Sequence, residues 1–339
     1  MKKKVGIFVG ENGHWGFFRE IFANLSTTYQ TTVFQPPTYT LPLLSGRLNR
    51  WSYAQQMRAL LQRTDVCFFE WASELLKAAS HLPASHRPLV ARLHSYEIYV
   101  WAPQIQWEAV DRIIFVSHYV RRKFLAQFPE QASKTCVIYN GVDLTRFQPP
   151  PVRDFRFTIG MLCNIHPVKR IYETIFTIAN LKRLGYQPHL HIAGGKWPGG
   201  HFDDYYAAIE RLIDKLDVRE EVTLHGPTST PERWLQEIDI FLSNSYWEGQ
   251  QVALLEAMAT GCYTLSHFWD GAEDILPAEC LFGAETELQQ KLIAYAELPA
   301  GEKQQRCAQL RALARDQFDI RTTTQAIRNV IEEVSSRSQ

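Results

Sequence analysis

Two glutamates separated by seven residues mark the segment EGQQVALLEAMATG, residues 248–261. An apolar run, IDIFLSNS, comes before this segment and is typical of a buried strand that ends in small polar residues. Good helix formers follow Glu248, and Gly261 is placed where a glycine commonly ends a helix. The pattern predicts a strand, a tight turn and a helix, with Glu248 in the turn and Glu256 inside the helix.

The start of such a helix suits a phosphate, because its first N–H groups are unpaired and its dipole is positive there. Glutamate cannot bind phosphate, but its carboxylate accepts hydrogen bonds from hydroxyls. A phosphate-binding helix start between two hydroxyl acceptors therefore indicates a site for a sugar nucleotide. The alternative is an amphipathic helix with one capping glutamate and one solvated glutamate.

Three further positions could belong to such a site. Lys169 follows a strand pattern and precedes a helix pattern, which makes it the best candidate for a role on a diphosphate, with an ordinary solvated lysine as the equal alternative. His94 ends the apolar run LVARLH, where ligand sites of α/β proteins form, although a lone histidine is often structural. The loop GENGHWGFF, residues 10–18, includes Gly13 and would let the backbone approach a ligand closely, unless it is a simple turn.

No metal and no cofactor are expected. His189 and His191 alternate on one strand face as metal ligands do, but no third ligand is evident near them. The glycine-rich loop matches a dinucleotide-binding fingerprint poorly. The sequence shows no recognisable Ser-His-Asp or Cys-His arrangement.

Short apolar runs alternate with helical stretches along the whole chain, which predicts parallel sheets covered by helices. The proline-rich segment QPPPV, residues 148–152, is the natural boundary between two domains. The predicted strands have the following sequences: VGIFVG, TTVFQ, VCFFE, LVARLH, RIIFVS and CVIYN in the first half, and FTIGML, HLHIAGG, VTLHG, IDIFLSN and YTLSH in the second.

The composition fits a globular protein of two domains. The 339 residues are 45% hydrophobic and 21% charged, and the basic start MKKKVGIFVG has too short an apolar part for a signal peptide. The six cysteines show no CxxC spacing and are expected to be reduced thiols. Residues 1–150 contain 17 Lys and Arg against 10 Asp and Glu, a balance of +7, and the rest of the chain balances it with −7.

The chain resembles the retaining glycosyltransferases of family four (glycosyl transferases group 1) in several segments. Their motif of two acids separated by seven residues, followed by small residues and glycine, matches Glu248 to Gly261. Matches to other family segments occur in the expected order: LVARLHSYE, VIYNGVDLTRFQP, IGMLCNIHPVKRIYETI, LHIAGG and VTLHGP. The resemblance implies the α/β GT-B fold, in which two Rossmann-like domains face each other across a cleft.

The family's organisation implies an acceptor-binding domain at residues 1–150, a nucleotide-sugar-binding domain at 151–317, and a C-terminal helix, 318–339, that returns to the first domain. It also implies that Glu248 and His94 contact the donor sugar, that Glu256 holds the ribose hydroxyls, and that Lys169 grips the diphosphate. The expected catalytic residues are His94, Lys169 and Glu248. The expected donor-binding residues are Gly13, Asn164, Lys169, Glu248, Gly249, Gln250, Gln251, Val252 and Glu256.

The chain departs from the family pattern at two places. Asn164 stands where the family usually has an arginine five residues before the lysine, so one positive charge is missing. Arg170 or an arginine of the first domain is a candidate replacement. Gln250 and Gln251 occupy positions where many members have an aromatic residue and glycine.

The expected function is transfer of a hexose from a UDP-sugar, with UDP-glucose favoured, to a glycan or lipid-linked acceptor, with retention and without a metal. The alternatives are a sugar-nucleotide epimerase of GT-B fold and a non-catalytic sugar-nucleotide-binding protein. The protein is expected in the cytoplasm, in polysaccharide biosynthesis, without a nucleic acid partner. Peripheral contact with the inner face of the membrane would involve Arg47, Arg50 and Arg58 in the basic amphipathic stretch 46–63, unless that stretch is a surface helix packed on its own sheet.

Overall fold

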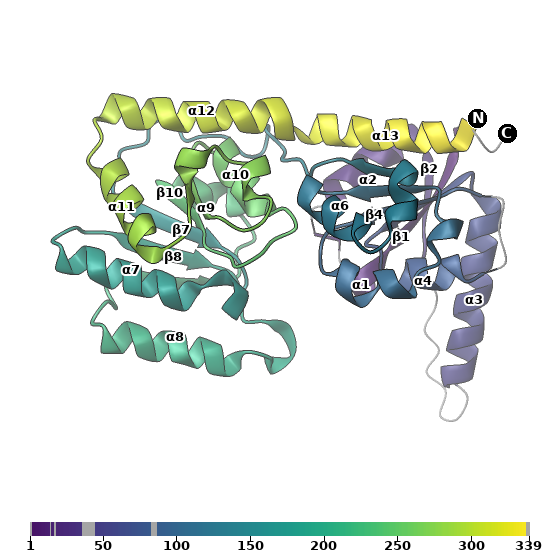
Figure 1. Cartoon of the computed structure of the whole chain (residues 1–339), viewed down its shortest axis with the longest axis horizontal. Helices are drawn as coiled ribbons and strands as arrows, with labels where there is room; N and C mark the ends of the chain where they lie inside the picture. The colour runs from purple at the N-terminus through teal and green to yellow at the C-terminus, as the bar shows by residue number, and fades with distance from the viewer. Residues whose placement is uncertain (1, 14, 17, 36–44, 83–86, 337–339) are drawn as a thin grey trace. The chain divides into compact units, whose positions relative to one another are not determined.

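The computed structural model describes residues 2–13, 15–16, 18–35, 45–82 and 87–336, without the side chains of 11, 12, 45–48 and 50. The chain forms two compact units. Unit 1 is the chain up to Asn140 together with the chain from Ile320 onward, and unit 2 runs from Gly141 to Asp319. Each unit is an α/β structure built on one six-stranded sheet, as predicted (Figure 1).

The sheet of unit 1 is parallel throughout, with the strand order β2-β1-β3-β4-β5-β6. Its strands are β1 (Lys4–Val9), β2 (Gln30–Val33), β3 (Val66–Glu70), β4 (Leu89–Leu93), β5 (Arg112–Phe115) and β6 (Thr135–Val137). Its helices are α1 (Gly10–Gly13), α2 (Phe18–Thr28), α3 (Ser45–Arg63), α4 (Glu74–Ser80), α5 (Glu97–Val100), α6 (His118–Leu125) and α13 (Ile320–Ser336).

The strands of unit 1 are buried on both faces because alternate residues point to opposite sides of the sheet. Phe69 packs with Met57 and Leu61 of α3 on one face, whereas the adjacent Phe68 packs with α2 and α13 on the other. Buried Met57 and Leu61 show that the amphipathic stretch packs on its own sheet, although Trp51 stays 65% exposed.

Unit 2 has a second parallel sheet, with the order β12-β11-β10-β7-β8-β9. Its strands are β7 (Thr158–Leu162), β8 (His189–Ala193), β9 (Val222–Gly226), β10 (Ile240–Ser243), β11 (Tyr263–His267) and β12 (Leu281–Phe282). Its helices are α7 (Ile171–Arg183), α8 (Asp203–Lys215), α9 (Pro231–Gln236), α10 (Val252–Ala259), α11 (Glu285–Ala296) and α12 (Ala300–Phe318).

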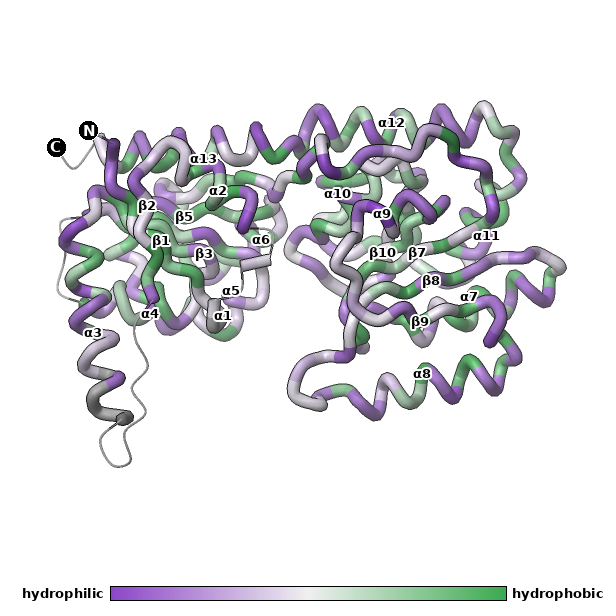
Figure 2. Tube along the Cα trace, turned by 180° about the vertical axis from the view of Figure 1, so that it is seen from behind, coloured by the Kyte–Doolittle hydropathy of each residue, from purple (hydrophilic) through white to green (hydrophobic). Residues whose placement is uncertain are grey.

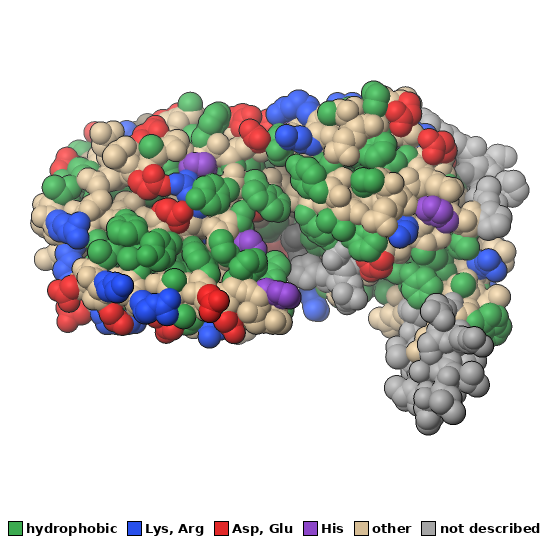
Figure 3. All heavy atoms as spheres, turned by 60° about the horizontal axis from the view of Figure 1, so that its bottom comes forward, with side chains coloured by type: hydrophobic (Ala, Val, Ile, Leu, Met, Phe, Trp, Pro, Cys, Tyr) green, Lys and Arg blue, Asp and Glu red, His purple; other side chains and the backbone are tan. Residues whose placement is uncertain are grey.

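Helices cover both faces of this second sheet as well. Figure 1 shows α12 and α10 on one side of it and α7 and α8 on the other. Hydrophobic residues gather along the strands, and hydrophilic residues follow the outward sides of α8 and α12 (Figure 2). Figure 3 shows hydrophobic side chains among charged ones on one face of unit 2. Phe176, Trp197 and Phe202 are exposed aromatic residues of unit 2.

All eleven predicted strands are present, and α10 spans the predicted helix, with Gly261 just beyond it at φ +78°. The two-residue strand β12 was not predicted. The units divide after Asn140, ten residues before the predicted boundary at 150, and again after Asp319 rather than 317. The proline-rich segment belongs to unit 2 because Arg153 donates to Thr260 O at 3.0 Å and Gln236 Nε2 donates to Gln148 O at 2.9 Å.

Candidate functional site

The sheet of unit 2 has its switch point between β7 and β10. The strands that follow β7 along the chain, β8 and β9, lie on one side of it, whereas β10, β11 and β12 lie on the other. Loops after β7 and β10 therefore leave in opposite directions and open a crevice at the carboxyl edge of the sheet, where ligands of α/β proteins bind. Lys169 follows β7 and Glu248 follows β10, so the fold brings both predicted residues to this edge.

Lys169 and Glu248 form an ion pair through Nζ and Oε1. Ser245, also in the loop after β10, donates to the same carboxylate oxygen at 2.6 Å. Burial alone would lower the pKa of Lys169, but the neighbouring Glu248 carboxylate outweighs burial and raises it. Lys169 therefore carries a positive charge whose partner is the acid predicted to contact the sugar. The sequence predicted both residues but not their contact.

The turn between Glu248 and α10 is built from residues of the predicted set. Gly249 and Gln250 are buried, and Gln251 precedes the first helical residue, Val252. The side chain of Gln251 makes no capping hydrogen bond to the helix. Its buried Oε1 atom has no hydrogen-bond partner within the described part of the chain. The start of α10 thus keeps its N–H groups unprotected by a side-chain cap, which suits an anionic ligand.

Glu256 lies in the middle of α10 and is half-buried, whereas Glu248 lies in the turn. The backbone oxygen of Glu256 accepts from Thr260 Oγ1 at 2.8 Å near the helix end. The two acids therefore occupy the two local environments that the sequence predicts. One acid sits on a rigid helix and the other on a turn held by Lys169 and Ser245.

The loop after β7 runs close to the loop after β8. A Cβ added to Gly194 would lie 1.9 Å from Cys163 O, so only glycine fits, and Gly194 also has φ +151°. Ile165 N donates to Gly195 O at 2.8 Å, which ties the two loops together. Asn164 is exposed on this loop. Its position therefore contributes an uncharged, solvated amide at the crevice.

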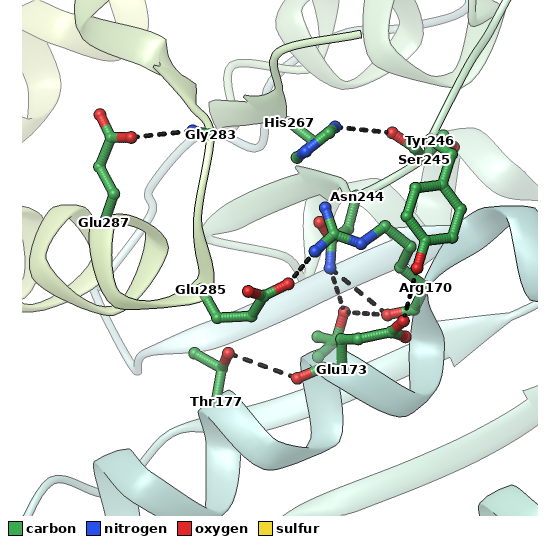
Figure 4. Close-up of polar contacts among 11 residues, drawn as sticks. Arg170, Glu173, Thr177, Asn244, Ser245, Tyr246, His267, Gly283, Glu285 and Glu287 are labelled. Carbon is green, nitrogen blue, oxygen red and sulfur yellow. Dashed lines mark hydrogen bonds and ion pairs between the residues drawn. The ribbon is translucent and has the colours of Figure 1, made fainter.

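Arg170 is one predicted replacement for the charge missing at Asn164. It has left-handed backbone (φ +52°), is only 6% exposed and forms an ion pair with Glu285 at the start of α11. Its guanidinium lies 4.9 Å from the ring centre of Tyr246, which donates to Glu173 at 3.0 Å (Figure 4). Within the described residues its Nε and Nη1 atoms have no hydrogen-bond partner. Its contacts thus go to Glu285 and Tyr246, not to Glu248.

Asn244 and His267 complete the polar group around Arg170 (Figure 4). Asn244 Nδ2 donates to Thr174 Oγ1 at 3.0 Å, which joins the end of β10 to α7. His267 Nδ1 lies 3.0 Å from Ser245 O and fixes the backbone next to Glu248. Burial and the charge of Arg170 lower the pKa of His267, and Nδ1 is the donor of this bond because a carbonyl oxygen only accepts. The loop after β10 and the end of β11 are therefore joined at Ser245, whose hydroxyl donates to Glu248.

In unit 1 the corresponding switch point lies between β1 and β3. His94 follows β4, is 6% exposed, and packs against Trp71 in a tilted arrangement, with ring centres 4.1 Å apart. Its Nε2 lies 2.9 Å from Glu70 Oε1, at the end of β3. Gly10 permits this packing, since a Cβ there would lie 2.0 Å from Ser73 Oγ in the loop after β3. The predicted Gly13 ends α1 with φ +79°.

Sequence reasoning did not select Glu70, Trp71 or Ser245. A signal was present for Glu70, because a charged residue ends the apolar run VCFFE and an arginine, Arg92, interrupts the neighbouring run LVARLH. Opposite charges in adjacent buried strands indicate a pair. No comparable signal exists for Trp71, whose positive φ of 71° is visible only in the structure.

His189 and His191 are joined by a third imidazole that the sequence did not suggest. His191 Nδ1 lies 2.9 Å from His225 Nε2 on the neighbouring strand, and the rings of His189 and His191 stack at 4.7 Å. Burial and the neighbouring His189 lower the pKa of His191 to about 4. Even so, among the residues that the structure describes, no group of three or more His, Cys, Asp or Glu side chains is placed to hold a metal ion.

Both units are doubly wound parallel sheets of Rossmann-like type, and in unit 2 a lysine–glutamate pair precedes an uncapped helix start at the carboxyl edge of the sheet. Family models match both units: Glycosyltransferase Family 4 over residues 16–146, and Glycosyl transferases group 1 over residues 156–297. The chain belongs to the family-four, group 1 glycosyltransferases.

Solved structures agree on the GT-B fold. HepE from Anabaena, solved in complex with UDP and glucose, superposes with a TM-score of 0.77 over 98% of this chain and 100% of that chain, at 19% identity. Sucrose-phosphate synthase from Thermosynechococcus elongatus gives a TM-score of 0.76 over 99% of this chain and 100% of that chain, at 13% identity.

Curated relatives match over part of the chain. A component of the phosphatidylinositol N-acetylglucosaminyltransferase of Arabidopsis thaliana is 26% identical over 182 residues, which is 52% of this chain and 39% of the relative. The putative colanic acid biosynthesis glycosyltransferase WcaL from Escherichia coli is 27% identical over 185 residues, 50% of this chain and 44% of the relative. The matched region thus spans less than half the length of these relatives.

Proposed function

We propose that the protein transfers a hexose from a UDP-sugar to a glycan or lipid-linked acceptor with retention of configuration. The observation that carries the proposal is the Lys169–Glu248 pair at the switch point of unit 2, next to the uncapped start of α10. A nucleotide sugar offers a diphosphate to the lysine and helix start and hydroxyls to the acid. The presence of UDP and glucose in the Anabaena HepE structure supports UDP-glucose as the donor.

In the proposed reaction the bond between the sugar carbon and the leaving phosphate oxygen breaks, and the acceptor oxygen bonds to the same face of that carbon. Negative charge grows on the diphosphate, where Lys169 and the α10 N–H groups stabilise it. The leaving phosphate oxygen takes the proton of the acceptor hydroxyl. Glu248 and His94 orient the sugar, and Glu256 holds the ribose hydroxyls. In this scheme protein groups alone stabilise the leaving group.

In the proposed binding step the donor replaces the ion pair between Lys169 and Glu248. When the diphosphate approaches Lys169, the lysine exchanges one anionic partner for another, and the Glu248 carboxylate is released to accept hydroxyls of the sugar. Ser245 remains beside Glu248 and limits how far its carboxylate moves. Donor binding therefore also frees the Glu248 carboxylate to contact the sugar.

A glycan or lipid-linked acceptor fits the kinds of relatives that match, including a phosphatidylinositol and a colanic acid glycosyltransferase by name. No helix of the described residues is long and apolar enough to cross a membrane. Peripheral contact through α3 stays a proposal: Arg58 and Trp51 are exposed, whereas the side chains of Arg47 and Arg50 lie outside the described residues. Sedimentation with anionic vesicles at low and high salt, with Arg58→Glu as the variant, tests it.

A screen of UDP- and GDP-sugars tests the donor, because a ligand that binds the folded state raises its apparent stability. We expect the largest thermal shift with UDP-glucose. Proton NMR of the released or transferred sugar then reports the anomeric configuration. Retained configuration in hydrolysis or transfer supports the transferase, inversion at a ring carbon of the free nucleotide sugar indicates an epimerase, and binding without turnover indicates a non-catalytic binding protein.

A further inference from the structure

A fully buried charged group lies at the carboxyl edge of the sheet in unit 1. Glu70 ends β3 and Arg92 lies in the neighbouring β4, and neither side chain is exposed to solvent. Arg92 Nη1 donates to Glu70 Oε1 at 3.0 Å, and Arg92 Nη2 donates to Asn140 Oδ1. Asn140 is the last residue of unit 1 before the chain enters unit 2.

Stability alone explains this group poorly. The strands around it are otherwise apolar, and a buried ion pair is often no more stabilising than apolar side chains of the same volume. Burial acts to raise the pKa of Glu70, but Arg92 and His94 outweigh burial and lower it, so the carboxyl stays ionised. An ionised carboxylate accepts hydrogen bonds and cannot donate them.

His94 is held from several sides. Its Nε2 lies 2.9 Å from Glu70 Oε1, which must be the acceptor, so Nε2 bears the proton. Its backbone N–H donates to Glu97 Oε1 at 3.0 Å, and Ser95 N donates to Glu97 Oε2 at 2.8 Å. The Trp71 side chain packs against the His94 ring. The backbone of Trp71 has a positive φ of 71°, which non-glycine residues rarely adopt and which is found mostly at functional sites.

We propose that Glu70 is a positioning residue that fixes His94 in the Nε2–H tautomer and in one ring orientation. Arg92 keeps the Glu70 carboxylate ionised, and Asn140 in turn holds the Arg92 side chain in place. In the neutral form of the ring the lone pair is then on Nδ1, and this sets whether that form of His94 accepts from a sugar hydroxyl or donates to one. The consequence for turnover rests on the proposed contact of His94 with the donor sugar, but the tautomer does not.

The test uses the full chain labelled with nitrogen-15 in histidine, with His94→Ala to identify the His94 ring signals. In the wild type we expect the neutral ring to show protonated Nε2 and unprotonated Nδ1. Glu70→Gln keeps the shape but offers both a donor and an acceptor, so we expect a mixture of tautomers or the Nδ1–H form. An unchanged Nε2–H tautomer in Glu70→Gln would overturn the proposal.

Two variants separate positioning from stability. Asp239→Asn is the matched control, because Asp239 is a buried acid (2% exposed) of unit 2 that bonds Arg156 N, Thr158 N and Thr158 Oγ1. It is expected to lower the unfolding temperature and leave the His94 tautomer unchanged. If Glu70→Gln does not fold, the double variant Glu70→Gln, Arg92→Met removes both charges together, and it is expected to show the same loss of the tautomer preference.

Kinetics link the positioning to the reaction. For Glu70→Gln we expect kcat/KM to fall about tenfold or more, as when an orienting partner of a functional histidine is lost. The affinity for UDP alone should not change, because the proposed UDP contacts are in unit 2. A changed tautomer with unchanged kcat/KM supports positioning and removes His94 from the proposed function. A changed tautomer in a protein that transfers no hexose supports positioning and overturns the proposed function itself.

Discussion

The carboxyl edges of the two sheets hold their charged groups in different ways. In unit 1, Glu70 and Arg92 are fully buried and His94 is 6% exposed, so the histidine is locked by partners that solvent does not reach. In unit 2, the side chains of Lys169 and Glu248 are 19% and 15% exposed, and their main partners are each other. A ligand can therefore exchange the partners of Lys169 and Glu248 at small cost, whereas exchange at His94 would break a buried network.

The two edges therefore differ in the role that we propose for each. In the proposed function the unit 2 edge is adjustable and binds a charged ligand that replaces one ion pair with another. The unit 1 edge is preorganised and presents one group in one orientation. Variants at the unit 2 edge should therefore change ligand affinity or turnover. Variants at the unit 1 edge should change the orientation of His94.

The largest effect is expected at Lys169. Lys169→Ala removes the cation next to the leaving diphosphate and should lower kcat by about 10²- to 10³-fold, as removal of one charge-stabilising donor does elsewhere. Its effect on UDP affinity should be smaller, because the charge on the diphosphate grows in the transition state. Steady-state kinetics and calorimetric titration with UDP provide the two measurements. Normal turnover would exclude Lys169 from the mechanism.

A second prediction divides the two acids. Glu256→Ala should weaken the binding of UDP by about 1.5–3 kcal/mol, the contribution of a hydrogen bond to a charged group. Glu248→Ala should spare UDP, or even tighten its binding since Lys169 loses its competing anion, while turnover falls. Titration of both variants with UDP measures the contrast. Equal losses of UDP affinity would mean that the two roles are assigned wrongly.

The neighbouring histidines His189, His191 and His225 predict that the stability of unit 2 depends on pH. Burial lowers the pKa of His191 from 6.5 to about 4, and burial also lowers the pKa of His225. Because the unfolded chain binds protons that the folded chain excludes, stability is full above about pH 6.5 and falls as the pH drops toward 4. His191→Gln should flatten this slope in thermal unfolding followed between these pH values. The groups around His191 are His189, His225, Thr223 and Arg156, and an equal slope in the variant would assign the effect to other groups.

The smallest effect is expected at Asn164. Asn164→Arg restores a positive charge on the exposed loop after β7 and should tighten UDP binding about two- to fivefold, the range for exposed charge pairs. Asn164→Gln is the matched control, since it lengthens the side chain without adding charge. If the arginine gives no gain while the fold is intact, another cation already neutralises the diphosphate.

The local parts of this fold could be predicted from the sequence. The apolar runs predicted these eleven strands, and the helix formers together with Gly261 predicted α10. Both signals are local, because each element depends on residues that are close together in the chain. The two-residue strand β12 was too short for any periodicity. The unit boundary was placed at the prolines, yet Arg153 and Gln148 bond to distant parts of unit 2, and such contacts are not visible in a local pattern.

The candidate site was predictable residue by residue but not as an arrangement. Lys169 and Glu248 were both selected, yet they lie 79 residues apart and only the β7–β10 pairing brings them together. Glu70 was treated as the end of a strand, because its partner Arg92 becomes a neighbour only through the β3–β4 pairing. Roles that depend on strand order were therefore missed where no motif supplied them.

Unit 1 is built from two separate stretches of the chain, and this affects the order in which the two units fold. Helix α13 supplies Ile327, Val330, Ile331 and Val334 to the core of unit 1, although it follows all of unit 2 in the chain. On the ribosome, unit 2 is one continuous segment and can complete its core as soon as it emerges. Unit 1, although made first, has only α2 on one part of that face of its sheet until α13 emerges, so the N-terminal half of the protein finishes folding last.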